Sequence, residues 1–92
     1  MYFVYLIYSP IHDRFYCGHT ENIDDRLKMH HSGKVSSTKA FKPWIVVYSE
    51  NFEAREDAIA RERYFKSGAG RRYLKEIKEG SRVPRPNAQN IQ

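Results

Sequence analysis

Cysteine is nearly absent from this chain of 92 residues, which contains only Cys17. A single cysteine excludes an internal disulfide and a cysteine-rich zinc site, and it suits the reducing cytoplasm, where we expect the protein to be found. The chain also lacks a long hydrophobic run. Its most apolar stretch, residues 1–8, is too short to cross a bilayer and has no basic leader, so we expect neither a membrane span nor a signal peptide.

Acidic residues are scarce toward the end of the sequence. Between residues 61 and 85, nine lysines and arginines are opposed only by Glu62, Glu76 and Glu79. The whole chain has a formal net charge of +5 and a pI of about 9.5. This balance favours a polyanionic partner, nucleic acid above all. A solvated basic surface would give the same composition, so charge alone does not decide between the two.

The order of apolar and turn-forming segments predicts one small α/β (α+β) domain over residues 1–79. Aromatic and β-branched residues predict strands at 2–8, 14–19 and 44–49, and a turn at 9–13 joins the first two as a hairpin. Helices are expected between Thr20 or Asn22 and Gly33, at 53–66 and at 71–79, with Gly68 and Gly70 ending the second. The result is a three-stranded, mostly antiparallel sheet flanked by helices, in the order strand-strand-helix-strand-helix-helix, with the first strand in the middle. Residues 80–92 contain few apolar side chains and are predicted to form a flexible tail.

Glu62 is the most informative residue of the second predicted helix. At 100° per residue, Ala54, Ala58 and Phe65 share one face, and Glu62 falls inside that arc. A carboxylate on a core-facing stripe needs a partner. That partner is either a metal ion or a cation of the chain, with Arg26 and Arg61 as the candidates.

Four further residues supply the remaining parts of a plausible phosphodiesterase site. Arg26 and His30 lie one turn apart on the first helix, and Tyr5 and Tyr16 lie on the two strands of the hairpin. The planar guanidinium of Arg26 suits phosphate oxygens. Structural roles are the alternatives: a surface arginine paired with Asp25 or Asn22, and core positions for the tyrosines and the histidine.

Several short motifs, taken in order, resemble the GIY-YIG nuclease superfamily. Val4-Tyr5-Leu6 and Tyr16-Cys17-Gly18 resemble its paired tyrosine signature, residues 20–30 resemble its arginine- and histidine-bearing helix, and residues 60–66 resemble its glutamate segment. The similarity covers residues 2–78 and is greatest to small single-domain members related to the N-terminal nuclease domain of UvrC. The chain departs from larger members in lacking a histidine after the first helix and an asparagine in the last helix.

The resemblance implies a metal-dependent endonuclease that hydrolyses phosphodiester bonds in DNA, structure-selective and linked to DNA repair or recombination. It implies that Glu62 binds Mg²⁺ or Mn²⁺, that Arg26 holds the scissile phosphate, and that Tyr5 accepts a proton from water with support from Tyr16 and His30. The alternatives are a non-catalytic nucleic-acid-binding module and a nuclease that acts only with a partner protein. RNA stays open as a substrate beside DNA.

Contacts with the nucleic-acid backbone are expected from basic side chains and one glycine. Gly18 near the end of its strand would allow a close backbone approach. Phosphate contacts do not depend on base sequence, so we expect selectivity for structure over sequence. The residues expected to make these contacts are Gly18, Lys34, Lys39, Lys42, Arg71 and Arg72.

Overall fold

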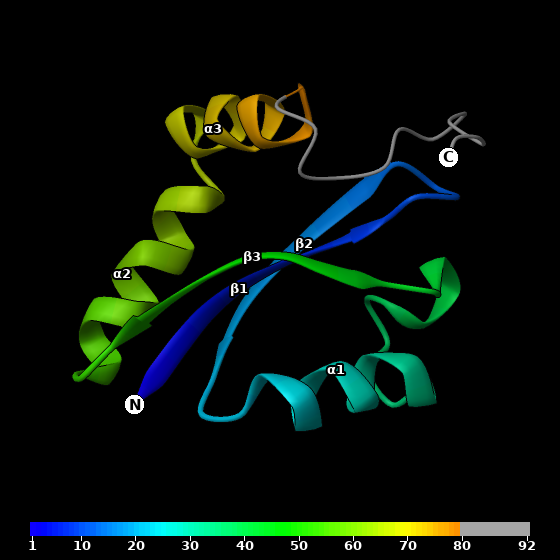
Figure 1. Cartoon of the computed structure of the whole chain (residues 1–92), viewed down its shortest axis with the longest axis horizontal. Helices are drawn as coiled ribbons and strands as arrows, with labels where there is room; N and C mark the ends of the chain where they lie inside the picture. The colour runs from blue at the N-terminus through cyan, green and yellow to red at the C-terminus, as the bar shows by residue number, and fades with distance from the viewer. Residues whose placement is uncertain (80–92) are drawn as a thin grey trace.

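Strands and helices follow one another along the chain in the predicted order. The computed structural model describes residues 1–79, so the predicted tail at 80–92 lies outside the described residues. Figure 1 shows the arrangement. The elements are β1 (Tyr2–Ser9), β2 (Arg14–Thr20), α1 (Ile23–Ser32), the 3-10 helix η1 (Lys39–Phe41), β3 (Ile45–Phe52), α2 (Arg55–Phe65) and α3 (Gly68–Glu79). Within residues 1–79, no helix is both long and apolar enough to cross a membrane.

β1 is the central strand of a three-stranded antiparallel sheet with the order β2-β1-β3, which confirms the prediction. Tyr5 of β1 lies opposite Gly18 of β2 and Ser49 of β3. Because side chains alternate across a strand, this register determines which residues of the hairpin share a face.

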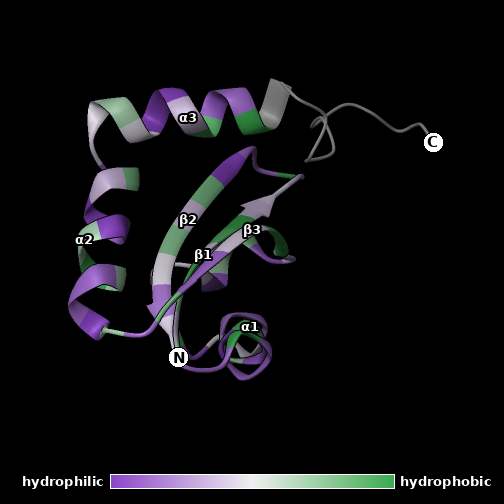
Figure 2. Ribbon diagram, turned by 60° about the vertical axis from the view of Figure 1, so that its left-hand side comes forward, coloured by the Kyte–Doolittle hydropathy of each residue, from purple (hydrophilic) through white to green (hydrophobic). Residues whose placement is uncertain are grey.

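The two faces of the sheet carry separate apolar clusters. Leu6 and Tyr8 pack with Phe65 and Ile77 on the face covered by α2 and α3, whereas Tyr5 packs with residues of the α1 side (Figure 1). Figure 2 shows the apolar residues of α2 and α3 turned toward the sheet. β1 is therefore buried on both faces, which explains its continuous apolar sequence.

Helix α1 begins and ends where the capping residues predict. The side chain of Asn22 accepts a hydrogen bond from the backbone N–H of Asp25 at 3.0 Å. Gly33 follows the helix with a φ of 83°, a left-handed conformation that glycine adopts without steric cost. These two caps fix the span of α1 and with it the positions of Arg26 and His30.

The prediction that Gly68 and Gly70 end the second helix is wrong, because α2 already ends at Phe65 and α3 begins at Gly68. Both glycines belong to the first turn of α3, which Ser67 precedes and caps with its side-chain oxygen, 3.3 Å from the N–H of Gly70. A Cβ at Gly70 would lie 2.0 Å from the carbonyl oxygen of Tyr64. Gly70 therefore permits the close approach of α3 to the end of α2, and its role is in packing, not in helix termination.

Candidate functional site

A buried cluster of hydrogen bonds forms between β1, α1 and the loop after α1. The hydroxyl oxygen of Tyr5 lies 2.9 Å from Nε2 of His30 and 3.3 Å from Nε of Arg26. The ring of Tyr16 lies beside both, with centroid distances of 5.0 Å to His30 and 6.4 Å to Tyr5. The structure thus brings together four of the residues that the sequence singled out, and Arg26 bonds to Tyr5 instead of to Asn22 or Asp25.

Thr38 determines which nitrogen of His30 carries the proton. The Thr38 hydroxyl donates to the carbonyl of Val35 at 3.3 Å, so it accepts the hydrogen bond from Nδ1–H of His30 at 2.8 Å. Nε2 of His30 is then an acceptor, and the Tyr5 hydroxyl donates to it. Tyr5 in turn accepts from Arg26. The chain of donors therefore runs from Arg26 through Tyr5, His30 and Thr38 to a backbone carbonyl.

The pKa values of Tyr5 and His30 favour the neutral form of both side chains. Burial, with smaller contributions from Arg26 and His31, lowers the pKa of His30 to about 4. Burial also raises the pKa of Tyr5 to about 12, although the hydrogen bond from Arg26 opposes that change. At neutral pH Tyr5 is thus protonated and His30 is uncharged, which is the state that the hydrogen bonds require.

Replacing Thr38 by valine should disturb this protonation pattern. Valine keeps the shape but removes the acceptor, which leaves Nδ1–H of the fully buried His30 without a partner at a cost of about 1–3 kcal/mol. The tautomer of lowest free energy should then be the one with the proton on Nε2, in which His30 no longer accepts a hydrogen bond from Tyr5. Long-range ¹H–¹⁵N NMR should show the Nδ1–H tautomer in the wild type and in Thr38→Ser, and lose it in Thr38→Val. An Nε2–H tautomer in the wild type would contradict the assignment.

His30 should also make stability depend on pH. The unfolded histidine binds a proton below its usual pKa of ~6.5, whereas the folded one does so only below about 4. The stabilisation is therefore complete above pH ~6.5 and decreases toward pH ~4, by up to roughly 3 kcal/mol. Urea unfolding at several pH values in this range would measure how the free energy of unfolding changes with pH. This change should be smaller for His30→Gln than for the wild type, and the same as in the wild type for the exposed control His12→Gln. Equal changes for all three proteins would contradict the buried neutral histidine.

Gly18 is required by the position of the Tyr5 side chain. A Cβ at Gly18 would lie 2.6 Å from the Tyr5 hydroxyl oxygen. Any larger residue would therefore displace the hydroxyl from His30 and Arg26. Gly18 was expected to allow the approach of a nucleic-acid backbone, and its immediate neighbour in the structure is this side chain.

Glu62 lies on the other side of β2, at the edge of the α2 face. Its two carboxylate oxygens lie 2.6 Å from Nδ1 of His19 and 2.7 Å from Nζ of Lys66. The ion pairs considered from the sequence, with Arg26 or Arg61, are thus wrong, and Arg61 pairs with Glu50 instead. Burial raises the pKa of Glu62, but the hydrogen bonds from His19 and Lys66 outweigh it and leave the pKa below its usual value.

The carboxylate of Glu62 is close enough to the tyrosine cluster to influence it. Burial is the main cause of the raised pKa of Tyr5, and the negative charge of Glu62 adds to it. The side chain of Glu62 is 19% exposed, so it is accessible from solvent without pointing away from the protein. The candidate site therefore spans the edge strand β2, with Tyr5, Arg26 and His30 on the α1 side.

Comparison with known proteins identifies the family. Residues 1–75 match the model of the GIY-YIG catalytic domain. The chain belongs to the GIY-YIG family. The resemblance of the sequence motifs is thereby confirmed, and this family generally comprises endonucleases that act on nucleic acid with a divalent metal ion.

Small bacterial proteins are among the relatives of this GIY-YIG domain. A UPF0213 protein of Limosilactobacillus reuteri is 37% identical over 68 residues, which cover 71% of this chain and 70% of that protein. A UPF0213 protein of Staphylococcus haemolyticus is 32% identical over 79 residues, covering 85% and 95%. The solution NMR structure of a UPF0213 protein from Bacillus halodurans matches with a TM-score of 0.51 and 29% identity, and covers 88% of this chain and 89% of that one.

A divalent metal ion fits Glu62 if the ion relies mainly on water and substrate for its ligands. Within residues 1–79, no three acidic, histidine or cysteine side chains form a metal-binding group. Mg²⁺ retains several waters and commonly takes only one or two protein carboxylates beside phosphate oxygens. Glu62 is the carboxylate of this GIY-YIG site that could hold it, on condition that Lys66 gives up its hydrogen bond.

The predicted backbone-contacting cations occupy two separate regions. Lys34, Lys39 and Lys42 are exposed in and beside the loop after α1, where Nζ of Lys42 donates to the carbonyl of His31 at 3.1 Å. Arg71 and Arg72 are exposed in α3. The two groups lie on opposite faces of the sheet, so they cannot form one continuous patch on a single face.

Sequence reasoning missed three residues of the candidate site, which are Lys66, His19 and Thr38. Lys66 could have been found from its spacing of four from Glu62, which places the two on adjacent turns of one helix face. His19 was not among the predicted site residues, although strand alternation places it on the α2 side with Cys17. Thr38 gave no signal, since it lies in a polar loop. His31, which lies outside the candidate site, accepts a hydrogen bond from the Trp44 backbone at 2.9 Å.

Proposed function

We propose that this GIY-YIG protein is a metal-dependent endonuclease that hydrolyses phosphodiester bonds in DNA. The observation that carries the proposal is the buried donor chain from Arg26 through Tyr5 to His30. A tyrosine hydroxyl placed between a guanidinium and a neutral imidazole is suited to move a proton beside a bound phosphate.

Arg26 would hold the scissile phosphate, because its guanidinium is only partly buried at the edge of the cluster. Its Nε donates to Tyr5, and its Nη1 makes only a weak contact with the sulfur of Met29 at 3.9 Å, which a phosphate oxygen could replace. The attacking water would give its proton to Tyr5 while Tyr5 gives its own proton to Nε2 of His30. These two transfers must be concerted, since a pKa of about 12 for Tyr5 and about 4 for His30 disfavours a standing tyrosinate–imidazolium pair. As the new P–O bond to the water oxygen forms, the P–O bond to the leaving oxygen would break. The leaving oxygen would take a proton from solvent, and His30 would lose its added proton to solvent as the product departs. A metal ion at Glu62 would supply charge stabilisation for the leaving oxygen.

The same proposal includes selectivity for branched or otherwise irregular DNA, as expected of a small enzyme in repair or recombination. A domain of this size offers few side chains for reading base sequence. Contacts to phosphates position a substrate without specifying its sequence. Selectivity would then come from the shape of the DNA around the site.

Removing the metal ion tests this function directly. The purified protein should cleave at least one member of a panel of linear, flapped and branched DNAs in Mg²⁺ or Mn²⁺. Cleavage should stop in EDTA and return when the metal ion is added back. Cleavage that persists in EDTA would contradict the metal requirement, and binding without cleavage of any member would favour a non-catalytic binding module.

A further inference from the structure

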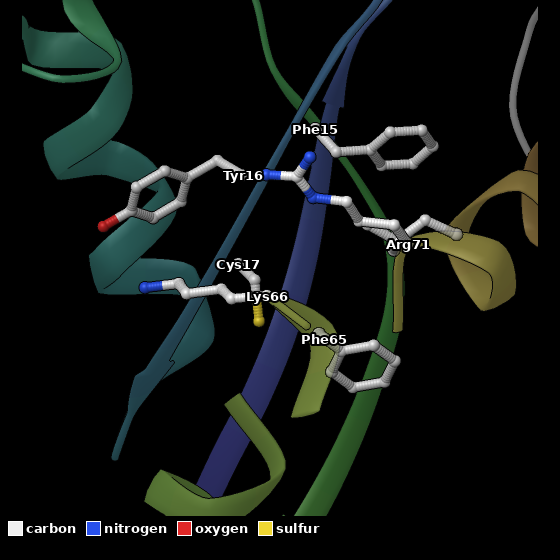
Figure 3. A pocket seen from close by; sticks show the side chains of 7 residues that line it. Phe15, Tyr16, Cys17, Phe65, Lys66 and Arg71 are labelled. Carbon is white, nitrogen blue, oxygen red and sulfur yellow. The ribbon is translucent and has the colours of Figure 1, made fainter. Parts of the chain in front are cut away.

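Two adjoining cavities form a groove between β2 and α3. The first has a volume of about 210 Å³ and is lined by side chains that include Phe15, Lys66 and Arg71, as Figure 3 shows. The second, of about 370 Å³, shares Phe15, Arg71 and Leu74 with the first and continues to Lys75. We call this surface, defined by these five residues, the β2–α3 groove.

The β2–α3 groove starts beside the candidate site. Tyr16 lines the first cavity, and its ring also packs against His30 in the tyrosine cluster. Lys66 lines the same cavity and bonds to Glu62. In Figure 3 the side chains of Lys66, which directly follows α2, and of Arg71 in α3 extend toward β2, whereas the ring of Tyr16 points to the α1 side. A polymer with one phosphate at Arg26 could therefore continue past Tyr16 into the groove.

The chemistry of the groove combines positive charge with an apolar floor. Lys66, Arg71 and Lys75 contribute three cations, and Phe15 and Leu74 contribute apolar surface. Asp13 is the one carboxylate among the described residues that line the two cavities, so cations outnumber acids in the groove. Cations that follow a backbone, with aromatic side chains beside them, are typical of surfaces that bind single-stranded nucleic acid.

Whether DNA is base-paired determines whether its bases can contact the apolar surface of Phe15 and Leu74. In a duplex, the faces of the bases are hidden in the stack, and only phosphates and groove edges can reach a protein. In an unpaired strand, the base faces are exposed and can pack on an aromatic ring. An apolar floor would therefore add nothing to the binding of intact duplex.

We infer that the β2–α3 groove binds an unpaired DNA strand that continues from the scissile phosphate. The inference rests on the proposed function for the identity of the polymer, and it adds the form of the substrate. Arg71 and Lys66 would contact its phosphates, and Phe15 would pack against a base. The enzyme would then select DNA in which one strand is unpaired beside the cut.

A matched pair of arginines tests the groove. Arg71 lines both cavities, whereas its neighbour Arg72 is exposed and lines neither of them. Arg71→Gln and Arg72→Gln remove the same charge from adjacent positions. Fluorescence anisotropy in EDTA would measure binding of the full chain to a labelled single strand, the matched blunt duplex and a duplex with a single-stranded extension.

The wild type should bind the single strand and the extended duplex at least about fivefold more tightly than the blunt duplex. Arg71→Gln should weaken single-strand binding by about fivefold, and Arg72→Gln by less than about twofold. Phe15→Leu, which keeps an apolar side chain in the core, should reduce single-strand binding and leave duplex binding unchanged. Unfolding curves would confirm that each variant is folded.

Equal effects of the two arginine variants, or tighter binding of blunt duplex, would overturn the inference, as would tighter binding of an RNA strand of the same sequence. Because binding is measured without metal, the result is separate from cleavage. Single-strand preference that depends on Arg71, together with no cleavage in Mg²⁺, would refute the proposed function alone. Cleavage in Mg²⁺, together with an equal loss of single-strand binding in Arg71→Gln and Arg72→Gln, would refute only the inference that the groove binds an unpaired strand.

Discussion

Glu62→Gln should reduce metal-dependent cleavage by more than about 100-fold while the domain stays folded. The amide has nearly the same shape as the carboxylate, but it lacks the charge that holds a hard cation. It also weakens the hydrogen bonds from His19 and Lys66, both of which are partly exposed and can turn to water. Initial rates of cleavage at saturating Mg²⁺ would measure the effect.

Glu50→Gln is a suitable control for this variant. Glu50 is about as exposed as Glu62, at 22% against 19%, and it is also ion-paired, to Arg61 at 2.9 Å. Loss of a general structural ion pair would affect both variants alike. A loss of activity in Glu50→Gln as large as that in Glu62→Gln would mean that Glu62 acts through stability alone.

Tyr5→Phe should lower the rate of cleavage by about 100- to 10,000-fold, the range that positioned proton transfer contributes. The substitution removes the hydroxyl that joins Arg26 to His30. It also leaves Nε2 of His30 without its donor, which should cost about 1–3 kcal/mol of unfolding free energy. Single-turnover rates and urea unfolding would separate the catalytic effect from the structural one.

Tyr8→Phe provides the matched comparison. Tyr8 is a fully buried tyrosine of the same strand, but it faces α2 and α3 and donates its hydrogen bond to Asp13. Tyr8→Phe should cost comparable stability with little effect on the rate in the folded protein. If Tyr5→Phe retained the activity of Tyr8→Phe, the proton-transfer role of Tyr5 would have to be abandoned.

Most of the fold could be predicted from the sequence because local signals agree with the tertiary structure. The apolar run of β1, the turn after Ser9 and the cap at Asn22 each specify one element boundary. The exception at Gly70 has a physical cause. Glycine signals either a helix end or a close contact between helices, and only the packing of α3 against Tyr64 distinguishes the two.

The candidate site was less accessible to prediction where its contacts are long-range. The spacing of Arg26 and His30 is a local property of a helix and predicted that they lie on one face; the structure adds that both contact Tyr5. The partners of Glu62 and of His30 depend on strand register and on a loop conformation. His19 lies 43 residues from Glu62 in sequence, and no periodic pattern within one element relates the two.

The outer backbone edge of β2 has no strand beside it among residues 1–79, since β2 pairs only with β1. Such an edge can add a strand from another chain. Here the added strand would lie next to the backbone of Tyr16 and His19, whose side chains contact His30 and Glu62 of the candidate site. Sheet extension at β2 would thus act as competitive inhibition, whereas extension at β3 would leave the site open. A peptide inhibitor of this domain is therefore best designed as an extended segment complementary to the edge of β2.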